Sequence, residues 1–169
     1  MMKHIPSKVL AAIVVLVLSS FYSGTPESFE SFIASKFQTL HDKEPNIKVY
    51  IVEFVGVGEC VKCVNTSYTI KTLFQKDTLL SKHFRYIAVP ITQRRRDAEA
   101  MKENNTIFDE FIPIKTQELS ERSIEMKDKF VLLDKNLTIR YTVSADKYLS
   151  NNFIKDMILE SRKIIGNNQ

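Results

Sequence analysis

The chain has 169 residues, of which 44% are hydrophobic and 26% are charged. This length suits one domain with its own core and is short for two, and the composition excludes a disordered or fibrous protein. The net charge is +4, and the one tight basic cluster, residues 94–96, is followed at once by Asp97 and Glu99. Because nucleic-acid binding needs a clustered basic face, nucleic acid is not expected as a partner.

The first residues predict export. Lys3 and Lys8 precede an apolar run at 9–18, and two serines follow it, which is the layout of a secretory signal. Residues 1–23 are therefore interpreted as a signal peptide and 24–169 as the mature domain, in the periplasm or on the outer face of the cytoplasmic membrane. Since no A-x-A cleavage triplet is present, an uncleaved N-terminal membrane anchor is the alternative, although the run is short for a spanning helix.

The next segments predict a helix followed by a buried strand. The helix is expected to begin near residues 25–28 and to run to about Leu40, followed by a polar connector over 41–46. Its apolar residues recur at helical spacing: Phe29, Phe32, Ile33, Phe37 and Leu40. Residues 47–55 are apolar and largely β-branched, which predicts a strand in the middle of a sheet.

A helix is expected from Cys60, a second strand over 84–91 and a further helix over 96–104. In the helix that starts at Cys60, the apolar residues expected to share one face are Val64, Tyr68, Leu73, Phe74 and Leu80. The segment 107–115 is ambiguous, and residues 111–114 could form a short edge strand, where proline is tolerated.

The C-terminal part predicts a β-hairpin and a last helix. Strands are expected over 129–133 and 137–143, with a turn at 134–136. The last helix is expected to be capped by Ser150 or Asn151 and to stop at Gly166. Its apolar residues are Phe153, Ile154, Met157, Ile158, Ile164 and Ile165. Alternating strands and helices followed by a hairpin predict an α/β fold with a parallel core and antiparallel strands at its side.

The only two cysteines, Cys60 and Cys63, form a C-x-x-C motif where a strand passes into a helix. A disulfide that closes so small a ring adds little stability, so the bond is expected to open and close. The first turn of a helix favours a thiolate. We therefore predict that Cys60 is the nucleophile and that Cys63 resolves the mixed disulfide.

Three charged residues are expected to act on this pair. Lys62 would stabilise the thiolate slightly, by at most about 1 kcal/mol. Glu59 precedes Cys60 and would oppose ionisation of its thiol. Glu53 interrupts an apolar strand, where a buried carboxylate without a partner normally takes up a proton. The alternative is that this strand lies at an edge and Glu53 points to water.

Residues 52–54, the glycine-containing loop, Cys60 and Cys63, the helix after them and residues 130–136 resemble the thioredoxin superfamily. The likeness is to its exported or membrane-tethered bacterial thiol-disulfide oxidoreductases, of the redoxin type, over roughly 33–165. It implies a three-layer α/β/α sandwich with a central mixed sheet and a C-terminal hairpin. It also implies disulfide exchange without a cofactor, with protein thiol or disulfide substrates and a redox partner protein. For Glu53 it implies a place beneath the cysteines, where it accepts and returns the proton of the resolving thiol.

The chain departs from this family at two places. It has no tryptophan ahead of Cys60, and the family's cis-proline position falls near Asp128, so Lys127 and Asp128 are the candidate substrate loop. A trans peptide bond is expected there because a cis bond without proline costs about 2.5–4 kcal/mol. The leading hypothesis is an oxidoreductase that works more as reductant than oxidant. The alternative is a binding module with a degenerate groove and a non-catalytic disulfide.

A metal site is not expected. Structural zinc needs four ligands, usually from a second C-x-x-C or a histidine pair, and the sequence has neither. His41 and His83 stand alone along the chain. A copper carrier resembling the thioredoxin-like copper chaperones would need a histidine ahead of the hairpin, and residues 124–130 contain none.

Overall fold

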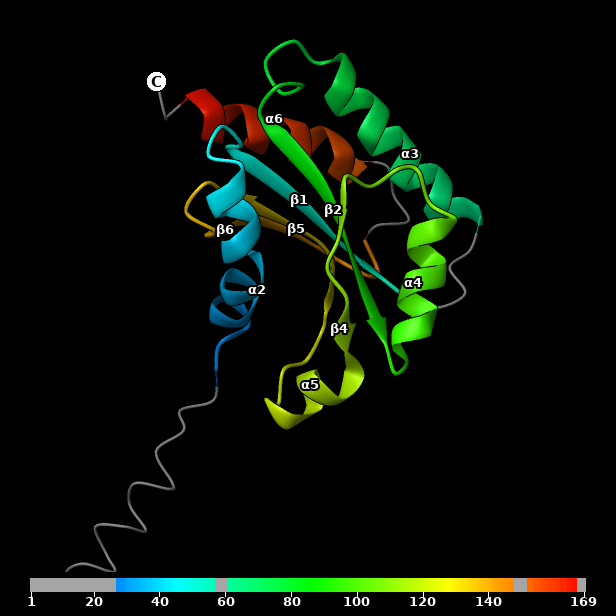
Figure 1. Cartoon of the computed structure of the whole chain (residues 1–169). Helices are drawn as coiled ribbons and strands as arrows, with labels where there is room; N and C mark the ends of the chain where they lie inside the picture. The colour runs from blue at the N-terminus through cyan, green and yellow to red at the C-terminus, as the bar shows by residue number, and fades with distance from the viewer. Residues whose placement is uncertain (1–26, 57–60, 148–151, 167–169) are drawn as a thin grey trace, which may run out of the picture.

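The computed structural model describes residues 27–56, 61–147 and 152–166 (Figure 1). In chain order the elements are α2 (Phe29–Lys43), β1 (Val49–Val55), α3 (Val61–Lys76), β2 (Phe84–Thr92), α4 (Arg95–Glu103), β3 (Glu110–Phe111), β4 (Ile114–Lys115), α5 (Thr116–Glu121), β5 (Asp128–Asp134), β6 (Ile139–Ser144) and α6 (Asn152–Gly166). The expected signal peptide, residues 1–23, lies outside the described residues. Within them, every helix is too short or too polar to cross a membrane.

The strands form one mixed sheet in the order β3-β2-β1-β5-β6, and β4 also pairs with β2. β2 runs parallel to β1 and β3, whereas β5 runs antiparallel to β1 and β6. All seven residues of β1 are buried because a strand covers each of its edges and helices cover both faces. The predicted α/β fold with a parallel core and a C-terminal hairpin is confirmed.

Alternation along β1 separates two cores. Val49 and Ile51 pack with residues of α3 and α6, and Tyr50 and Val52 pack with residues of α2 and α5. Figure 1 shows α2 and α6 on opposite sides of the sheet. Since side chains of a strand alternate between faces, this arrangement gives the three layers that the family resemblance implied.

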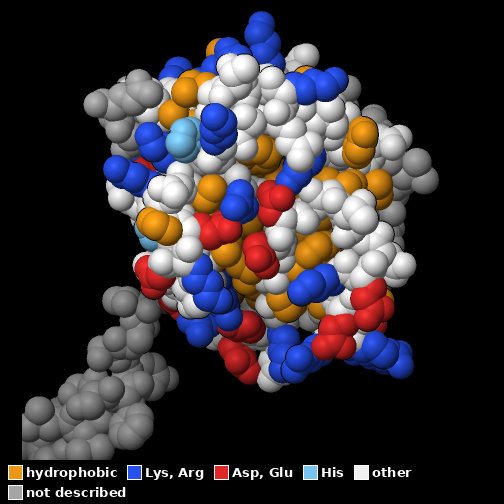
Figure 2. Space-filling model, turned by 45° about the horizontal axis from the view of Figure 1, so that its top comes forward, with side chains coloured by type: hydrophobic (Ala, Val, Ile, Leu, Met, Phe, Trp, Pro, Cys, Tyr) orange, Lys and Arg blue, Asp and Glu red, His pale blue; other side chains and the backbone are white. Residues whose placement is uncertain are grey.

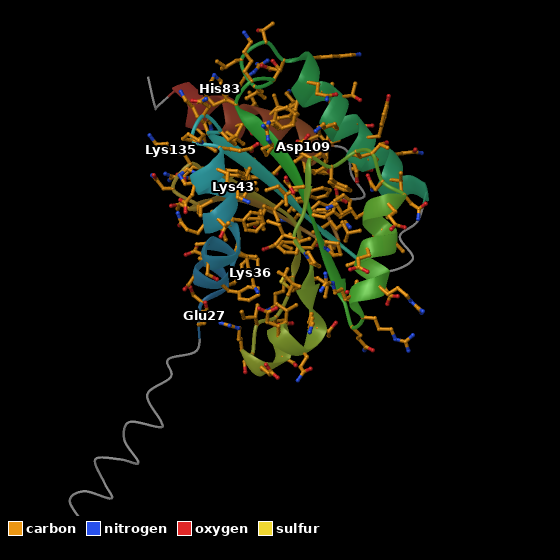
Figure 3. All side chains as sticks on the ribbon, viewed as in Figure 1. Glu27, Lys36, Lys43, His83, Asp109 and Lys135 are labelled. Carbon is orange, nitrogen blue, oxygen red and sulfur yellow. The ribbon has the colours of Figure 1, made fainter. Side chains whose placement is uncertain are left out.

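Helix α2 packs as its pattern predicts but runs three residues further. The Ser28 hydroxyl oxygen caps it by accepting from the Ser31 amide at 3.1 Å. Phe32, Ile33 and Phe37 are completely buried. The helix continues past Leu40 to Lys43 because His41, assigned to the connector, packs inward and bonds the Tyr50 hydroxyl at 3.0 Å. Lys36 of α2, labelled in Figure 3, is ion-paired with Glu118 of α5.

The ambiguous segment 107–115 contains two short strands, where the pattern allows one edge strand over 111–114, and it is followed by a helix that the pattern does not predict. β3 and β4 both pair with β2 and are separated by Ile112 and Pro113. Pro113 has no N–H to give to a ladder, which breaks the edge strand in two. Helix α5 has only six residues and one buried residue, Leu119, so it has almost no apolar periodicity to detect.

The hairpin turn is held by one side chain. Asp134 Oδ1 accepts from the amides of Asn136 and Thr138 at 2.8 and 3.1 Å, and its Oδ2 accepts from Arg140 at 2.7 Å. Leu137 has a φ of 60°, a left-handed conformation that tight turns impose. The predicted turn at 134–136 is confirmed.

The end of α3 is fixed to α6. Asp77 Oδ1 accepts from the amides of Leu79 and Leu80, each at 3.0 Å, and its Oδ2 accepts from Arg162 of α6 at 2.6 Å. Burial raises the pKa of Asp77, but the hydrogen bonds from Arg162 and these amides outweigh it, so the pKa lies below its ordinary value of 3.8. The apolar face predicted for α6 is confirmed, with Ile158 partly buried and the other five residues buried. Its proposed caps, Ser150 and Asn151, lie outside the described residues.

Candidate active site

Cys63 lies where the central strand passes into a helix. β1 ends at Val55, α3 begins at Val61, and Cys63 is therefore in the first turn of α3. It is 7% exposed. Cys60 and Glu59 lie outside the described residues, and of Lys62 only the backbone, in the first turn of α3, is described. The strand-to-helix placement predicted for the motif is observed for Cys63.

Glu53 is completely buried in the central strand. It lies on the same face of β1 as Val49 and Ile51, toward α3, and is 0% exposed. The alternative in which this strand is an edge strand and Glu53 points to water is wrong, because β2 and β5 flank β1 on both sides.

Three side chains surround the Glu53 carboxylate. Ser67 Oγ lies 3.0 Å from Glu53 Oε1 and 2.8 Å from Oε2, the Tyr86 hydroxyl donates to Oε2, and Lys129 Nζ lies 3.4 Å from Oε1. We call these four residues the carboxylate cluster. Two hydroxyl donors and one cation favour the ionised carboxylate, so Glu53 is not the partnerless acid for which proton uptake was expected.

Lys129 reaches Glu53 because of an irregularity in β5. The neighbouring Phe130 is directly opposite Glu53 across β1 and β5, and its side chain belongs to the core beneath α3. Regular alternation would send Lys129 to the other face. However, the register between β5 and β6 shifts between Asp128 and Phe130, as at a β-bulge, which re-aims side chains. Lys129 Nζ also donates to the carbonyl of Phe54 at 2.7 Å, and its side chain is 10% exposed.

Ser67 connects the cluster to Cys63. The two residues are four positions apart on α3 and therefore share one face of the helix. Ser67 Oγ lies 3.0 Å from the carbonyl oxygen of Cys63. One hydroxyl group thus contacts both the backbone of Cys63 and the buried carboxylate.

A cavity of about 160 Å³ opens beside this hydroxyl, between α3 and the segment after α4. Its lining residues are Val55, Val64, Ser67, Met101, Asn104, Asn105, Ile107, Phe108 and Phe111. Asp109 fixes the part of the cavity lining that Ile107 and Phe108 form. It accepts a hydrogen bond from the Tyr86 amide at 2.8 Å and is ion-paired with Lys71 of α3. Figure 3 shows Asp109 between β2 and α3.

The candidate substrate loop lies at the end of the sheet where α3 begins. Asp128 opens β5, two residues before the partner of Glu53. Lys127 is exposed and pairs with Glu125 at 3.0 Å. Among the described residues every peptide bond is trans, as expected for this loop.

The apolar face predicted for the helix after Cys60 is right at Phe74 and Leu80, which are completely buried, and wrong at its other three residues. Val64, Tyr68 and Leu73 are 45%, 63% and 41% exposed. The residues that α3 buries are Cys63, Thr66, Ser67, Ile70 and Phe74. The helix is rotated toward this second set because it packs over a polar group, the Glu53 carboxylate, for which Ser67 is a better neighbour than an apolar side chain.

Charges of both signs are mixed over the surface. Figure 2 shows Lys and Arg side chains interspersed with Asp and Glu over the face in view. Several of these are paired across elements, such as Arg85 with Glu44 at 2.7 Å. The carboxylate cluster therefore differs from the surface charges in its burial.

Comparisons with known proteins identify the fold. No protein-family model matches the chain, and no curated protein sequence does either. A thioredoxin-like protein from Porphyromonas gingivalis matches in structure with a TM-score of 0.52 and 15% identity, over 72% of this chain and 78% of that one. BsSco, a member of the Sco family of cytochrome c oxidase assembly proteins, matches with a TM-score of 0.52 and 12% identity, over 82% of this chain and 84% of that one. Together with the sheet order and the helices on both faces, these matches show that the chain has the thioredoxin-like fold.

Proposed function

We propose that the chain is a thiol-disulfide oxidoreductase that works outside the cytoplasm through Cys60 and Cys63. The observation that carries this proposal is the position of Cys63, in the first turn of α3 and joined through Ser67 to the buried Glu53. Such a neighbour does not strengthen a disulfide bond, whereas a carboxylate close to a thiol can act as general base during exchange. The location rests on the export pattern of residues 1–23.

The proposed reaction takes place in two steps. The Cys60 thiolate attacks a substrate disulfide, forms a mixed disulfide and releases one substrate thiolate, which takes up a proton. Cys63 then gives its proton to the Glu53 carboxylate, and the electron pair stays on its sulfur. That thiolate attacks Cys60 Sγ and releases the second substrate sulfur as a thiolate, which takes up the proton that Glu53 gives back. The substrate gains two electrons, and a partner protein with a reduced dithiol returns them to the cysteine pair.

We propose reduction as the main direction. Glu59 precedes Cys60, and a negative charge there disfavours the Cys60 thiolate, which makes the disulfide form harder to reduce and the dithiol a better donor. Lys62 acts in the opposite sense, but an exposed lysine contributes little.

Insulin reduction tests the proposal. The full-length chain, supplied with dithiothreitol, is expected to precipitate the insulin B chain faster than dithiothreitol alone. Cys60→Ser is expected to abolish the acceleration, since the nucleophile is gone. If wild type and Cys60→Ser give the same rate, the chain is not an oxidoreductase of this kind.

A binding module is the second candidate. Asp128 stands where the resembling family has a proline that receives substrate, and the adjacent Lys127 is exposed and paired with Glu125. In that case the scaffold would bind a partner protein without exchanging disulfides. Equal insulin rates for wild type and Cys60→Ser would favour this candidate.

A further inference from the structure

We propose that Ser67 is a positioning residue for thiol chemistry at Cys63, a hydroxyl that keeps Glu53 hydrogen-bonded in both of its protonation states. This inference rests on the proposed function and adds a residue to it. Ser67 is 2% exposed and lies between Glu53 and Cys63. Its hydroxyl satisfies the buried carboxylate, and its second contact, with the Cys63 carbonyl oxygen, places it beside the proposed resolving cysteine as well.

The hydroxyl proton of Ser67 has three oxygen atoms within hydrogen-bond distance. Ser67 Oγ lies 2.8 and 3.0 Å from the two oxygens of Glu53, and 3.0 Å from the Cys63 carbonyl oxygen. The hydroxyl has a single O–H, so it donates in one direction at a time and can accept a hydrogen bond as well. Two arrangements of the same heavy atoms are therefore available.

The charge of Glu53 selects between the two arrangements. When Glu53 is ionised, Ser67 donates to the carboxylate. When the S–H bond of Cys63 breaks and Glu53 takes the proton, the new carboxyl O–H donates to Ser67 Oγ, and Ser67 turns its own proton to the Cys63 carbonyl. No buried polar group loses its partner in either state, which lowers the cost of the transfer.

The other groups around Glu53 favour its ionised state. Lys129 of β5 contributes a cation at 3.4 Å, and Tyr86 of β2 contributes a hydroxyl donor. From α3, Cys63 is the titratable group on the face that covers Glu53. The Tyr86 hydroxyl can also donate or accept, but Ser67 is the contact that additionally reaches the backbone of Cys63.

Ser67 also lines the cavity beside α3. A volume of about 160 Å³ has room for several water molecules. Ser67 therefore borders both this cavity and Glu53.

Threonine and valine at position 67 test the role of the hydroxyl, because the two side chains have nearly the same shape and only threonine has an O–H. The reduced full-length protein is mixed with dithiobis(nitrobenzoate) in a stopped-flow instrument. The first equivalent of coloured thiolate reports attack by Cys60, and the second reports resolution by Cys63. Ser67→Val is expected to slow the second phase about tenfold at neutral pH and to move its pH profile to higher pH, while Ser67→Thr keeps both near wild type. The first phase is expected to stay unchanged in both variants.

The outcomes separate this inference from the proposed function. If valine and threonine give the same second phase and the same pH profile, Ser67 is only a packing residue and the inference is wrong. If the wild-type protein itself shows no second phase, Cys63 does not resolve the mixed disulfide and the proposed function is wrong, whatever the role of Ser67. Ser67→Ala is a further variant without a hydroxyl, and it must match Ser67→Val if the missing O–H is the cause.

Discussion

Glu53 is a charged group in the middle of the molecule, and three residues from three elements account for its stability there. Removing a carboxylate from water costs several kcal/mol, and only well-placed donors and a counter-charge offset this. Ser67, Tyr86 and Lys129 provide them. Because Lys129 leaves the exposed surface to do so, its ion pair differs from the solvent-screened pairs elsewhere on the protein.

Lys129→Met is expected to destabilise the fold by about 3 kcal/mol, because it leaves Glu53 buried without its cation. Lys129→Arg keeps the positive charge and is expected to lose less stability than Lys129→Met. The measurement is urea unfolding at neutral pH, with Glu53→Gln and the double variant completing a cycle. The double variant should lose clearly less than the sum of the two single losses. Strictly additive losses would show that the two side chains do not interact.

Sequence reasoning finds some of these residues and misses others for physical reasons. Glu53 is detectable because a charge interrupts an apolar strand. Lys129 is not, since only the bulge in β5 turns it toward Glu53, and alternation predicts the opposite face. Ser67 and Tyr86 carry no pattern of their own, and they become recognisable only when the acid they contact is known to be buried.

At the scale of elements, α3 is the helix whose packing departs most from its sequence pattern. Apolar side chains such as Val64 and Tyr68 are exposed, and the buried face combines Ile70 and Phe74 with polar residues. The pattern misleads because hydrophobicity is only one reason to bury a face. Helices α2 and α6, which cover the two faces of the sheet, bury the residues that their patterns predict.

Substitutions on α3 test which face is buried. Ile70→Ala and Phe74→Ala are each expected to cost about 2–5 kcal/mol, since both side chains are completely buried. Tyr68→Ser and Val64→Ser are expected to change stability by no more than about 0.5 kcal/mol, as surface positions do. Thermal or urea unfolding of the four variants decides the matter. If Tyr68→Ser lost much stability and Ile70→Ala lost little, the buried face of α3 would be the one that contains Tyr68.

For the molecule as a whole, the order of elements was predictable and the details between α4 and the hairpin were not. The long elements β1, α2 and α6 could be predicted, β1 from its continuous apolar run and the two helices from the spacing of their apolar residues. β3, β4 and α5 are only two to six residues long and depend on tertiary contacts with β2. The site lies at one end of this sheet, where β1 ends and where α3 and β5 begin. The fold therefore brings together residues as far apart in the sequence as Glu53 and Lys129.

The most direct test of the central claim is redox equilibration of Cys60 and Cys63 against a series of glutathione buffers, followed by acid quenching and alkylation. The account predicts a single two-electron transition, with a midpoint nearer the about −270 mV of reducing thioredoxins than the about −120 mV of strongly oxidising relatives. Cysteines that stay in one state across the whole series would contradict it.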